Sequence, residues 1–258
     1  MKLGIIGATG WLGQALGLRV ISQGLWDEGD LVLCNRSGNR TAYAAHPKVV
    51  WADVAGLCVA SDVIVIAVRP EDFPLKGFDP QGNLVISFMT VWTLAKLQRL
   101  SPKARIVRAM PNGAAPMGAS YTPWVGAGLD AQDASLVARI VSAMGGQDAV
   151  QSEDQLDYLA ALSGSGSAYP ALMAQAMLAD ALARGLPEVV ARAAVEAVMC
   201  GSAGFLAGKM GELDALLSTY RSYKGVTAAG LDTAESGLRQ AITAALAAAT
   251  AKAKALGQ

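Results

Sequence analysis

The chain has 258 residues, which is long enough for one large domain or two modest ones. It carries 21 basic and 21 acidic residues, so it lacks the positive excess that a protein needs to bind a nucleic-acid backbone. Hydrophobic residues make up 53% of the chain and charged residues 16%, a balance that excludes intrinsic disorder and predicts a large buried core.

The same composition narrows the kinds of site that we expect. No uninterrupted apolar run reaches the ~18 residues of a membrane helix, so we expect no membrane partner. The three cysteines form no CxxC pair and are odd in number, which favours reduced thiols and a cytoplasmic location. The one histidine, His46, precedes Pro47 in a polar stretch, which argues against a histidine-based metal site and a serine–histidine hydrolase.

The first half of the chain alternates segments typical of buried strands with segments of helical spacing. Residues 11–22 have the spacing of a helix. Apolar runs predict strands at residues 2–7, 31–35, 62–68, 84–87 and 106–110. Continuous apolar strands separated by helices are typical of a parallel sheet covered on both faces. We therefore expect a doubly wound α/β domain of the Rossmann type over residues 1–152.

The second half has the pattern of an all-α domain over residues 153–258. Long alanine-rich segments predict helices at residues 171–184, 187–206 and 237–256. Residues 218–230 interrupt them with polar residues and glycines, so we expect an irregular loop there, either functional or a plain connection. Because the helices are apolar on more than one face, we expect a homodimer or a higher multiple.

A glycine-rich turn follows the first predicted strand. Residues 7–13 read GATGWLG, one residue longer than the common GxGxxG, and they open the helix predicted from residue 11. Glycines let backbone N–H groups approach a pyrophosphate, and the helix N-terminus adds partial positive charge. A turn of this kind can also be purely structural. Our interpretation is dinucleotide binding by Gly7, Thr9, Gly10, Trp11 and Leu12.

The end of the second predicted strand indicates which dinucleotide binds. NAD-binding domains usually place an acidic residue there to hold the ribose hydroxyls. Here the strand is followed by Asn35, Arg36 and Ser37, so no acid repels a 2′-phosphate, and an arginine and a serine are available to hold one. We expect NADPH as the cofactor, with NADH possible. The alternative is that Arg36 is an ordinary solvated charge.

Four segments resemble motifs of the pyrroline-5-carboxylate reductase family, in the same order along the chain. Residues 62–70 (DVIVIAVRP) are similar to the family's fourth strand and its AV(K/R)P end, and residues 108–112 (RAMPN) to its R-x-MPN. Residues 161–169 (ALSGSGSAY) are similar to its LSGSGPAY, and residues 222–231 (SYKGVTAAGL) to its SPGGTTxxGL. The resemblance covers the whole chain, and the MPN and SGSG motifs together are fairly specific.

The resemblance implies a Rossmann-type domain followed by a helical dimerisation domain, and the reduction of 1-pyrroline-5-carboxylate to proline in proline biosynthesis. By position, it implies that residues 7–12 hold the pyrophosphate and residues 35–37 the adenosine ribose. It also implies a substrate loop. The residues that it places around the nicotinamide half are Val68, Arg69, Pro70, Met110 and Asn112, and those of the substrate loop are Ser222, Gly225 and Thr227.

The implied reaction needs no strong catalytic group. A cyclic imine protonates readily to an iminium, so the protein has mainly to hold the cofactor beside the imine carbon. By the resemblance, the Thr227 hydroxyl would donate to the ring nitrogen, which makes Thr227 the candidate catalytic residue. Ser222 and backbone N–H groups of the loop would bind the substrate carboxylate.

Several positions depart from the family pattern. In the loop, Tyr223 stands for a proline, Lys224 for a glycine and Val226 for a threonine. Ser167 replaces the proline of GSGPAY. Residues 87–94 are bulkier than the family's small-residue segment, where the nicotinamide face is expected. We therefore expect the family's fold with cofactor and substrate sites that have changed.

Three alternatives to this assignment have different sequence requirements. A short-chain-dehydrogenase-like enzyme needs Tyr-x-x-x-Lys on a helix, and the match at Tyr220 and Lys224 comes late and runs into Gly225. A 3-hydroxyacid dehydrogenase needs a lysine after the Rossmann domain, and none lies between Lys103 and Lys209. A non-catalytic dinucleotide-binding paralogue stays open, because changes in the loop can remove activity without affecting the cofactor site.

Overall fold

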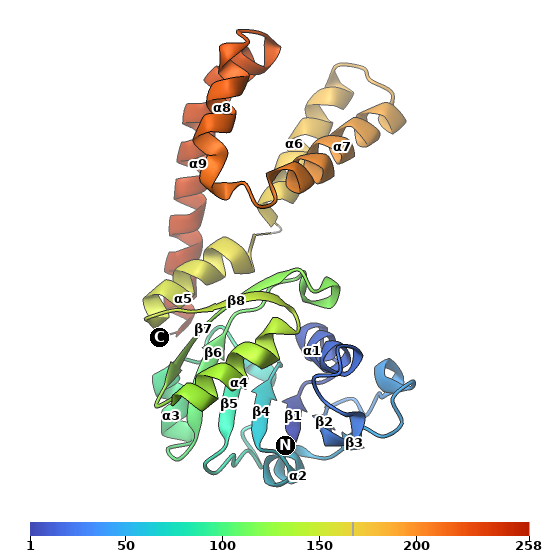
Figure 1. Ribbon diagram of the computed structural model, residues 1–258, viewed down its shortest axis with the longest axis vertical. Helices are drawn as coiled ribbons and strands as arrows, with labels where there is room; N and C mark the ends of the chain where they lie inside the picture. Colours follow the sequence, from blue (N-terminus) through green and yellow to red (C-terminus); the bar gives the residue numbers. More distant parts are fainter. Residues whose placement is uncertain (167, 258) are drawn as a thin grey trace. The chain divides into compact units, whose positions relative to one another are not determined.

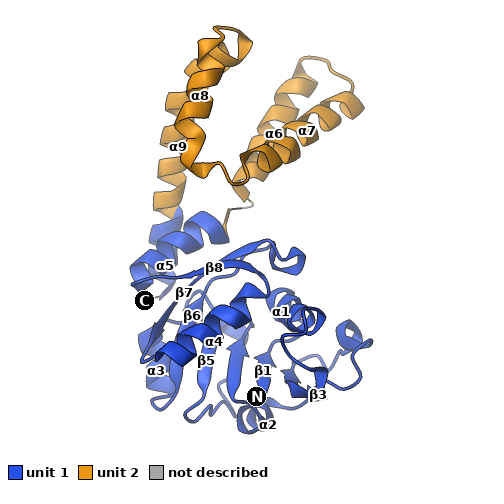
Figure 2. Cartoon of the chain, in the orientation of Figure 1, with its two compact units in different colours: residues 1–164, 249–258 blue, residues 165–248 orange. Residues whose placement is uncertain are grey.

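The computed structural model describes residues 1–166 and 168–257, which form two compact units (Figure 2). Unit 1 contains residues 1–164 and the end of the chain from residue 249, and unit 2 contains residues 165–248. This division differs from the one predicted after residue 152. Helix α5 (Glu153–Leu159) belongs to unit 1 because its Leu156 is fully buried there, in a small core cluster with Met110 and Val125.

Unit 1 is built on a sheet that has eight strands among the described residues, in the order β3-β2-β1-β4-β5-β6-β7-β8. Every neighbouring pair from β3 to β6 is parallel. The strands of this parallel part are β1 (Leu3–Ile6), β2 (Leu31–Cys34), β3 (Val50–Trp51), β4 (Val63–Ile66), β5 (Leu84–Ser87) and β6 (Arg105–Ala109). Four of them, β1, β2, β4 and β5, are buried at every position, which explains their continuous apolar sequences.

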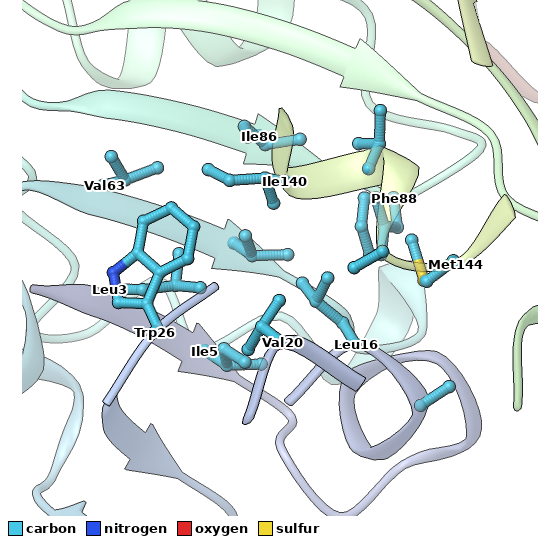
Figure 3. Packing of buried hydrophobic residues seen from close by; sticks show 14 of the residues in the cluster. Leu3, Ile5, Leu16, Val20, Trp26, Val63, Ile86, Phe88, Ile140 and Met144 are labelled. Atoms are coloured by element: carbon cyan, nitrogen blue, oxygen red, sulfur yellow. The ribbon is translucent and has the colours of Figure 1, made fainter. Parts of the chain in front are cut away.

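Helices cover both faces of this sheet, as a doubly wound fold requires. One core cluster packs α1 (Trp11–Ser22) and α4 (Ala131–Ser142) against the sheet, with Leu16, Val20 and Ile140 beside Ile5 and Ile86 (Figure 3). A second cluster packs α2 (Val54–Ala60) and α3 (Leu94–Leu100) against the other side chains of the same strands. The predicted fold class is confirmed, and α1 has the bounds expected from the sequence.

The last two strands of the sheet were not predicted. Strand β7 (Ser120–Ala127) runs antiparallel to β6, and β8 (Gly145–Ala149) runs parallel to β7. The sheet is therefore mixed, and the expectation of a purely parallel sheet is wrong at this edge. The sequence does not reveal these strands because β7 reads SYTPWVGA, with Pro123 in its middle, and β8 reads GGQDA, with no apolar run.

Unit 2 is helical, as predicted. Helices α6 (Ala168–Ala183) and α7 (Glu188–Leu206) pack side by side (Figure 1). Helix α8 (Leu213–Ser222) is followed by the long α9 (Val226–Gly257), whose last residues from 249 belong to unit 1. The expected irregular loop at residues 218–230 is wrong, because only residues 223–225 separate α8 from α9. Short helical turns occur at η1 (Glu28–Asp30), η2 (Thr41–Tyr43), η3 (Pro70–Asp72), η4 (Ala115–Met117), η5 (Ala160–Gly164) and η6 (Met210–Glu212).

The helices of unit 2 expose many large apolar side chains. Examples are Leu172, Met173, Met177, Val189, Val198, Phe205 and Leu238. In the described part of the chain, α7 is the one helix long and apolar enough to cross a membrane by length and composition. Its apolar sequence is interrupted by Arg192 and Glu196, so no continuous apolar run marks it. An apolar helix that one subunit leaves exposed is also what a subunit interface needs.

Candidate functional site

The glycine turn between β1 and α1 fits a phosphate group. Gly7 has a φ of +87°, and a Cβ there would lie 2.7 Å from the carbonyl oxygen of Ala67, so only glycine fits. A Cβ on Gly13 would overlap the Gly7 carbonyl oxygen. Gly10 is the N-cap of α1 and has no side chain that can cap the first backbone N–H groups of the helix. Those N–H groups are therefore suited to an anionic ligand.

Tyr43 supports this turn from the side of the core. Its buried hydroxyl lies 3.2 Å from the carbonyl oxygen of Ala8 and 3.4 Å from that of Gly13, within reach to donate to either. Burial raises the pKa of the Tyr43 hydroxyl, so it keeps its proton for this contact. A Cβ on Gly17 would overlap the same hydroxyl. Sequence reasoning missed Tyr43, because its position beneath the turn depends on how η2 folds back onto α1.

A cavity of about 730 Å³ opens beside the glycine turn. It lies at the carboxyl ends of β1, β2 and β4, next to the point where the strand order reverses, which is where doubly wound domains bind nucleotides. Its glycine cradle and its size fit a dinucleotide. The predicted cofactor residues that line it are Gly7, Thr9, Gly10, Trp11, Leu12, Asn35, Arg36, Ser37, Val68 and Arg69.

Three of the predicted nicotinamide residues lie outside the lining of this cavity. Pro70 begins the turn η3. Met110 is buried in the small cluster with Leu156. Asn112 is held by hydrogen bonds, since its side chain donates to the carbonyl of Ser163 at 3.1 Å and accepts from the Ala114 N–H at 3.0 Å. Their roles in cofactor binding stay predictions.

The loop after β2 forms the part of the cavity where we expect the adenosine end of the cofactor. The Asn35 side chain orders this loop, because its Nδ2 donates to Thr9 Oγ1 at 3.2 Å and its Oδ1 accepts from the Gly38 N–H at 3.0 Å. The Arg36 side chain is 84% exposed and forms an ion pair of 2.6 Å with Asp72. Asp72 lies in η3 and lines the same cavity, as does Asp53. Neither acid is predicted from the sequence, because both lie outside the segment that directly follows β2.

The bulky segment after β5 packs mainly into the core. Phe88 lines the cavity but is only 6% exposed, and Met89 is buried. The Trp92 ring meets the edge of Phe73 with centroids 5.0 Å apart. Of these three residues, Phe88 is therefore the one that lines the cavity.

Arg108, the first residue of the RAMPN motif, ties this segment to β6 and α5. Its side chain is 2% exposed and pairs with Glu153 and, at 3.4 Å, with Asp157. Its Nη2 also donates to the Thr90 carbonyl at 3.0 Å, and Glu153 accepts from the Leu94 N–H at 2.9 Å. Burial raises the pKa of Asp157, and the Arg108 charge opposes that rise. Arg108 is thus a structural centre of unit 1.

The predicted substrate residues gather at the short turn between α8 and α9. Ser222 ends α8, and its hydroxyl donates to the Thr219 carbonyl at 2.8 Å. Gly225 directly precedes α9, and Thr227 lies exposed in the first turn of that helix. Arg221 joins the two helices through ion pairs with acidic residues of α9, namely Asp232 at 2.9 Å and Glu235 at 2.7 Å.

The residues that differ from the family pattern surround this turn. Tyr223 is 76% exposed and Val226 is 91% exposed. Lys224 has a φ of +52°, a left-handed conformation that suits the glycine found there in the family pattern. Since α8 ends at Ser222, Tyr220 and Lys224 do not share a helix as the short-chain-dehydrogenase alternative requires. The Ser167 substitution lies outside the described residues.

Comparisons with known proteins decide the family. Residues 153–256 match the model of the pyrroline-5-carboxylate reductase dimerisation domain, and residues 2–90 match that of NADP oxidoreductase, coenzyme F420-dependent. The pyrroline-5-carboxylate reductase of Mycobacterium tuberculosis is 30% identical over 99% of this chain and 96% of its own length. The chain belongs to the pyrroline-5-carboxylate reductase family.

Other relatives agree over the whole chain. The pyrroline-5-carboxylate reductase of Synechocystis is 28% identical and aligns with 100% of this chain and 99% of its own length. The structure of the Coxiella burnetii enzyme has a TM-score of 0.88 and 29% identity, covering 100% of this chain and 98% of that one. The Plasmodium falciparum enzyme, solved with NADP bound, has a TM-score of 0.84 at 24% identity, with the same coverage, and shows the same fold. The family predicted from the motifs is confirmed, and the N-terminal half is of the NADP oxidoreductase type.

Proposed function

We propose that this member of the pyrroline-5-carboxylate reductase family reduces the C=N bond of 1-pyrroline-5-carboxylate with NADPH and so produces proline. One observation carries the proposal: a glycine cradle opens onto a nucleotide-sized cavity in a chain that matches curated reductases along its full length. The activity belongs to proline biosynthesis, and we propose a cytoplasmic location for it.

Bound NADPH would supply the hydride for this reduction. The N–H groups of Gly7, Ala8 and Gly10 donate to backbone carbonyls within the turn and to Cys34. In the cavity, the backbone N–H groups of Thr9, Trp11 and Leu12 would therefore hold the pyrophosphate, aided by the N-terminus of α1. Arg36 and Ser37 would hold the 2′-phosphate. Val68 and Arg69, which follow β4 and line the cavity, would contact the nicotinamide half. We propose that Asn35 acts mainly by ordering the loop that carries Arg36.

The turn between α8 and α9 would bind the substrate. A protonated cyclic imine is already an electrophile, so the protein needs to orient it and to stabilise its ring nitrogen and its carboxylate. We propose that the Thr227 hydroxyl donates to the ring nitrogen and that the N–H groups at the start of α9, near Gly225, hold the carboxylate. Because the Ser222 hydroxyl donates to its own helix, it would serve the carboxylate only by turning away from Thr219.

We further propose that the chain works as a homodimer or a multiple of one. The match to a dimerisation domain over residues 153–256 supports self-association, and the exposed apolar side chains of α6, α7 and α9 supply the surface for it. Light scattering at micromolar concentration tests the assembly. A monodisperse monomer would contradict it.

The decisive experiment measures NADPH oxidation by the purified protein with 1-pyrroline-5-carboxylate and with a panel of cyclic imines that differ in ring size and carboxylate position. We expect turnover with 1-pyrroline-5-carboxylate and none with imines that lack a carboxylate. NADPH binding is measured separately by calorimetry. Binding without turnover on any imine would refute the proposed reaction.

That last outcome would support a second candidate, a non-catalytic nucleotide-binding paralogue. The observation in its favour is the trio of changes at the turn, where Tyr223, Lys224 and Val226 replace family residues. The double change Tyr223→Pro with Lys224→Gly tests it. A large gain in activity on 1-pyrroline-5-carboxylate would show that the turn has moved away from that substrate, and no change would show that both residues are bystanders.

A further inference from the structure

The cavity carries an acid at the place where the cofactor's 2′-phosphate is expected. Asp72 and Arg36 both line it, and their side chains form an ion pair of 2.6 Å. Arg36 follows β2 and Asp72 lies shortly after β4, the two strands that flank β1 and its glycine turn. The cation that would recognise a 2′-phosphate is therefore already paired with a carboxylate from another loop.

The pair is placed so that a ligand can compete for it. The Arg36 side chain is 84% exposed and that of Asp72 is 32% exposed, so neither is locked in the core. Asp53 lines the same cavity, but its carboxylate caps α2 by accepting from the Gly56 N–H at 2.8 Å. Asp72 is thus the cavity acid whose contact with Arg36 a phosphate would have to replace or share.

The negative charge of Asp72 determines which of the two cofactors it favours. A 2′-phosphate that binds Arg36 gains a charge-assisted hydrogen bond, but it displaces an existing one and approaches the negative charge of Asp72. The 2′-hydroxyl of NADH carries no charge and can donate to a carboxylate, as it does to the acid of ordinary NAD-binding domains. The same carboxylate therefore weakens the binding of NADPH, and it leaves the binding of NADH unchanged or strengthens it.

We propose that Asp72 is a cofactor-specificity residue, whose carboxylate competes with the 2′-phosphate of NADPH for Arg36 and narrows the preference for NADPH over NADH. The inference rests on the proposed use of NADPH in this cavity. It assigns to η3 a role that the end of β2 alone does not reveal.

Calorimetric dissociation constants for NADPH and NADH test the proposal in four variants of the full chain. Asp72→Asn removes the competing charge and keeps the side-chain shape, so the Kd for NADPH should fall by about fivefold, the upper end of the range for an exposed ion pair. The Kd for NADH should change little or rise. Glu71→Gln is the matched control, because it removes the same charge from the neighbouring position, which does not line the cavity. Its two constants should stay within about twofold of wild type.

The double variant Arg36→Ala with Asp72→Asn, compared with Arg36→Ala alone, isolates the competition. Without Arg36, removing the Asp72 charge should tighten NADPH much less than it does in the wild-type background. An equal gain in NADPH affinity with and without Arg36 would show that Asp72 does not compete with the phosphate for Arg36. Weaker NADPH binding by Asp72→Asn, or no difference from Glu71→Gln, would also overturn the proposal.

These binding constants do not depend on turnover. If the protein binds NADPH but reduces no imine, the proposed reaction fails while Asp72→Asn still decides the specificity role. If the wild-type protein binds neither nucleotide, the inference is overturned together with the cofactor assignment.

Discussion

The Asn112 side-chain amide donates a hydrogen bond of 3.1 Å to the carbonyl of Ser163, a residue 51 positions later in the chain. The two residues belong to the MPN and SGSG motifs, which in the sequence are separate family markers. The backbone N–H of Asn112 also donates to Ser120 Oγ at 2.9 Å, so the residue is fixed from both its side chain and its main chain. Asn112 thereby connects the end of β6 to the turn η5.

Substituting Asn112 with alanine tests whether this connection is structural. The variant loses the bond to Ser163 and the one to Ala114, so we expect its free energy of unfolding to fall by about 1–3 kcal/mol in chemical denaturation. Because Asn112 lies outside the lining of the cavity, its Kd for NADPH should change little. Unchanged stability with strongly weakened NADPH binding would return Asn112 to the cofactor site.

Arg36→Ala should separate the two nicotinamide cofactors. Loss of the guanidinium removes the one charged group that we assign to the 2′-phosphate, so NADPH binding should weaken by roughly 1–3 kcal/mol, while NADH binding changes little. The pair of dissociation constants is measured by calorimetry at one ionic strength. An equal loss for both cofactors would show that Arg36 does not recognise the phosphate.

Gly17→Ala should destabilise the glycine turn through Tyr43. The added methyl would overlap the Tyr43 hydroxyl, and overpacking of this kind costs about 1–3 kcal/mol. Tyr43→Phe removes the overlapping oxygen, so the double variant should lose less stability than the sum of the two single variants. Additive losses in thermal or chemical unfolding would show that the turn relaxes in some other way.

The sequence predicts the fold well where hydrophobic burial alone determines structure. Strands β1 and β5 are continuous apolar runs because both faces of the sheet are covered, and α1 starts at Trp11 because the glycine turn ends there. Strands β7 and β8 escape prediction because their polar and glycine residues carry no such pattern. The loop predicted at residues 218–230 is mostly helix, since one left-handed residue, Lys224, is enough to end α8.

Some residues of the candidate site can also be predicted from local sequence, and others cannot. Residues next to the ends of strands, such as Gly7 and Arg36, follow from local sequence because parallel strands all deliver their carboxyl ends to one edge. The roles of Tyr43 and Asp72 cannot be predicted from local sequence, because they depend on contacts with distant segments. Tyr43 contacts the glycine turn, and Asp72 pairs with Arg36. Contacts between loops depend on strand order, which no single motif encodes.

Asp157 should give the protein a measurable pH dependence. Burial raises its pKa in the folded state, so the folded protein binds this proton more readily than the unfolded chain does. Its contribution to stability is therefore complete below the unfolded pKa of about 3.9 and is lost as pH rises through the folded value. As pH rises from about 4 through the raised folded pKa of Asp157, the unfolding free energy of the wild type should fall relative to that of Asp157→Asn.

The control is Asp154→Asn in the same helix, whose side chain is 78% exposed and forms an ion pair with the exposed Lys254, a contact that contributes little to stability. Chemical denaturation at several pH values compares the three proteins. Parallel curves for wild type and Asp157→Asn would show that Arg108 fully compensates the burial of Asp157.

Thr227 is the one residue to which we assign contact with the reacting ring. Replacing its hydroxyl with a methyl group in Thr227→Val keeps the side-chain shape, so kcat should fall by about a hundredfold, the scale of a lost proton donor. Thr227→Ser retains the hydroxyl without the methyl and should keep most of the activity. Neither change touches the lining of the cavity, so the Kd for NADPH should stay at the wild-type value in both. Full activity in Thr227→Val would remove the assignment, and equal losses in the valine and serine variants would show that the methyl group, and not the hydroxyl, matters.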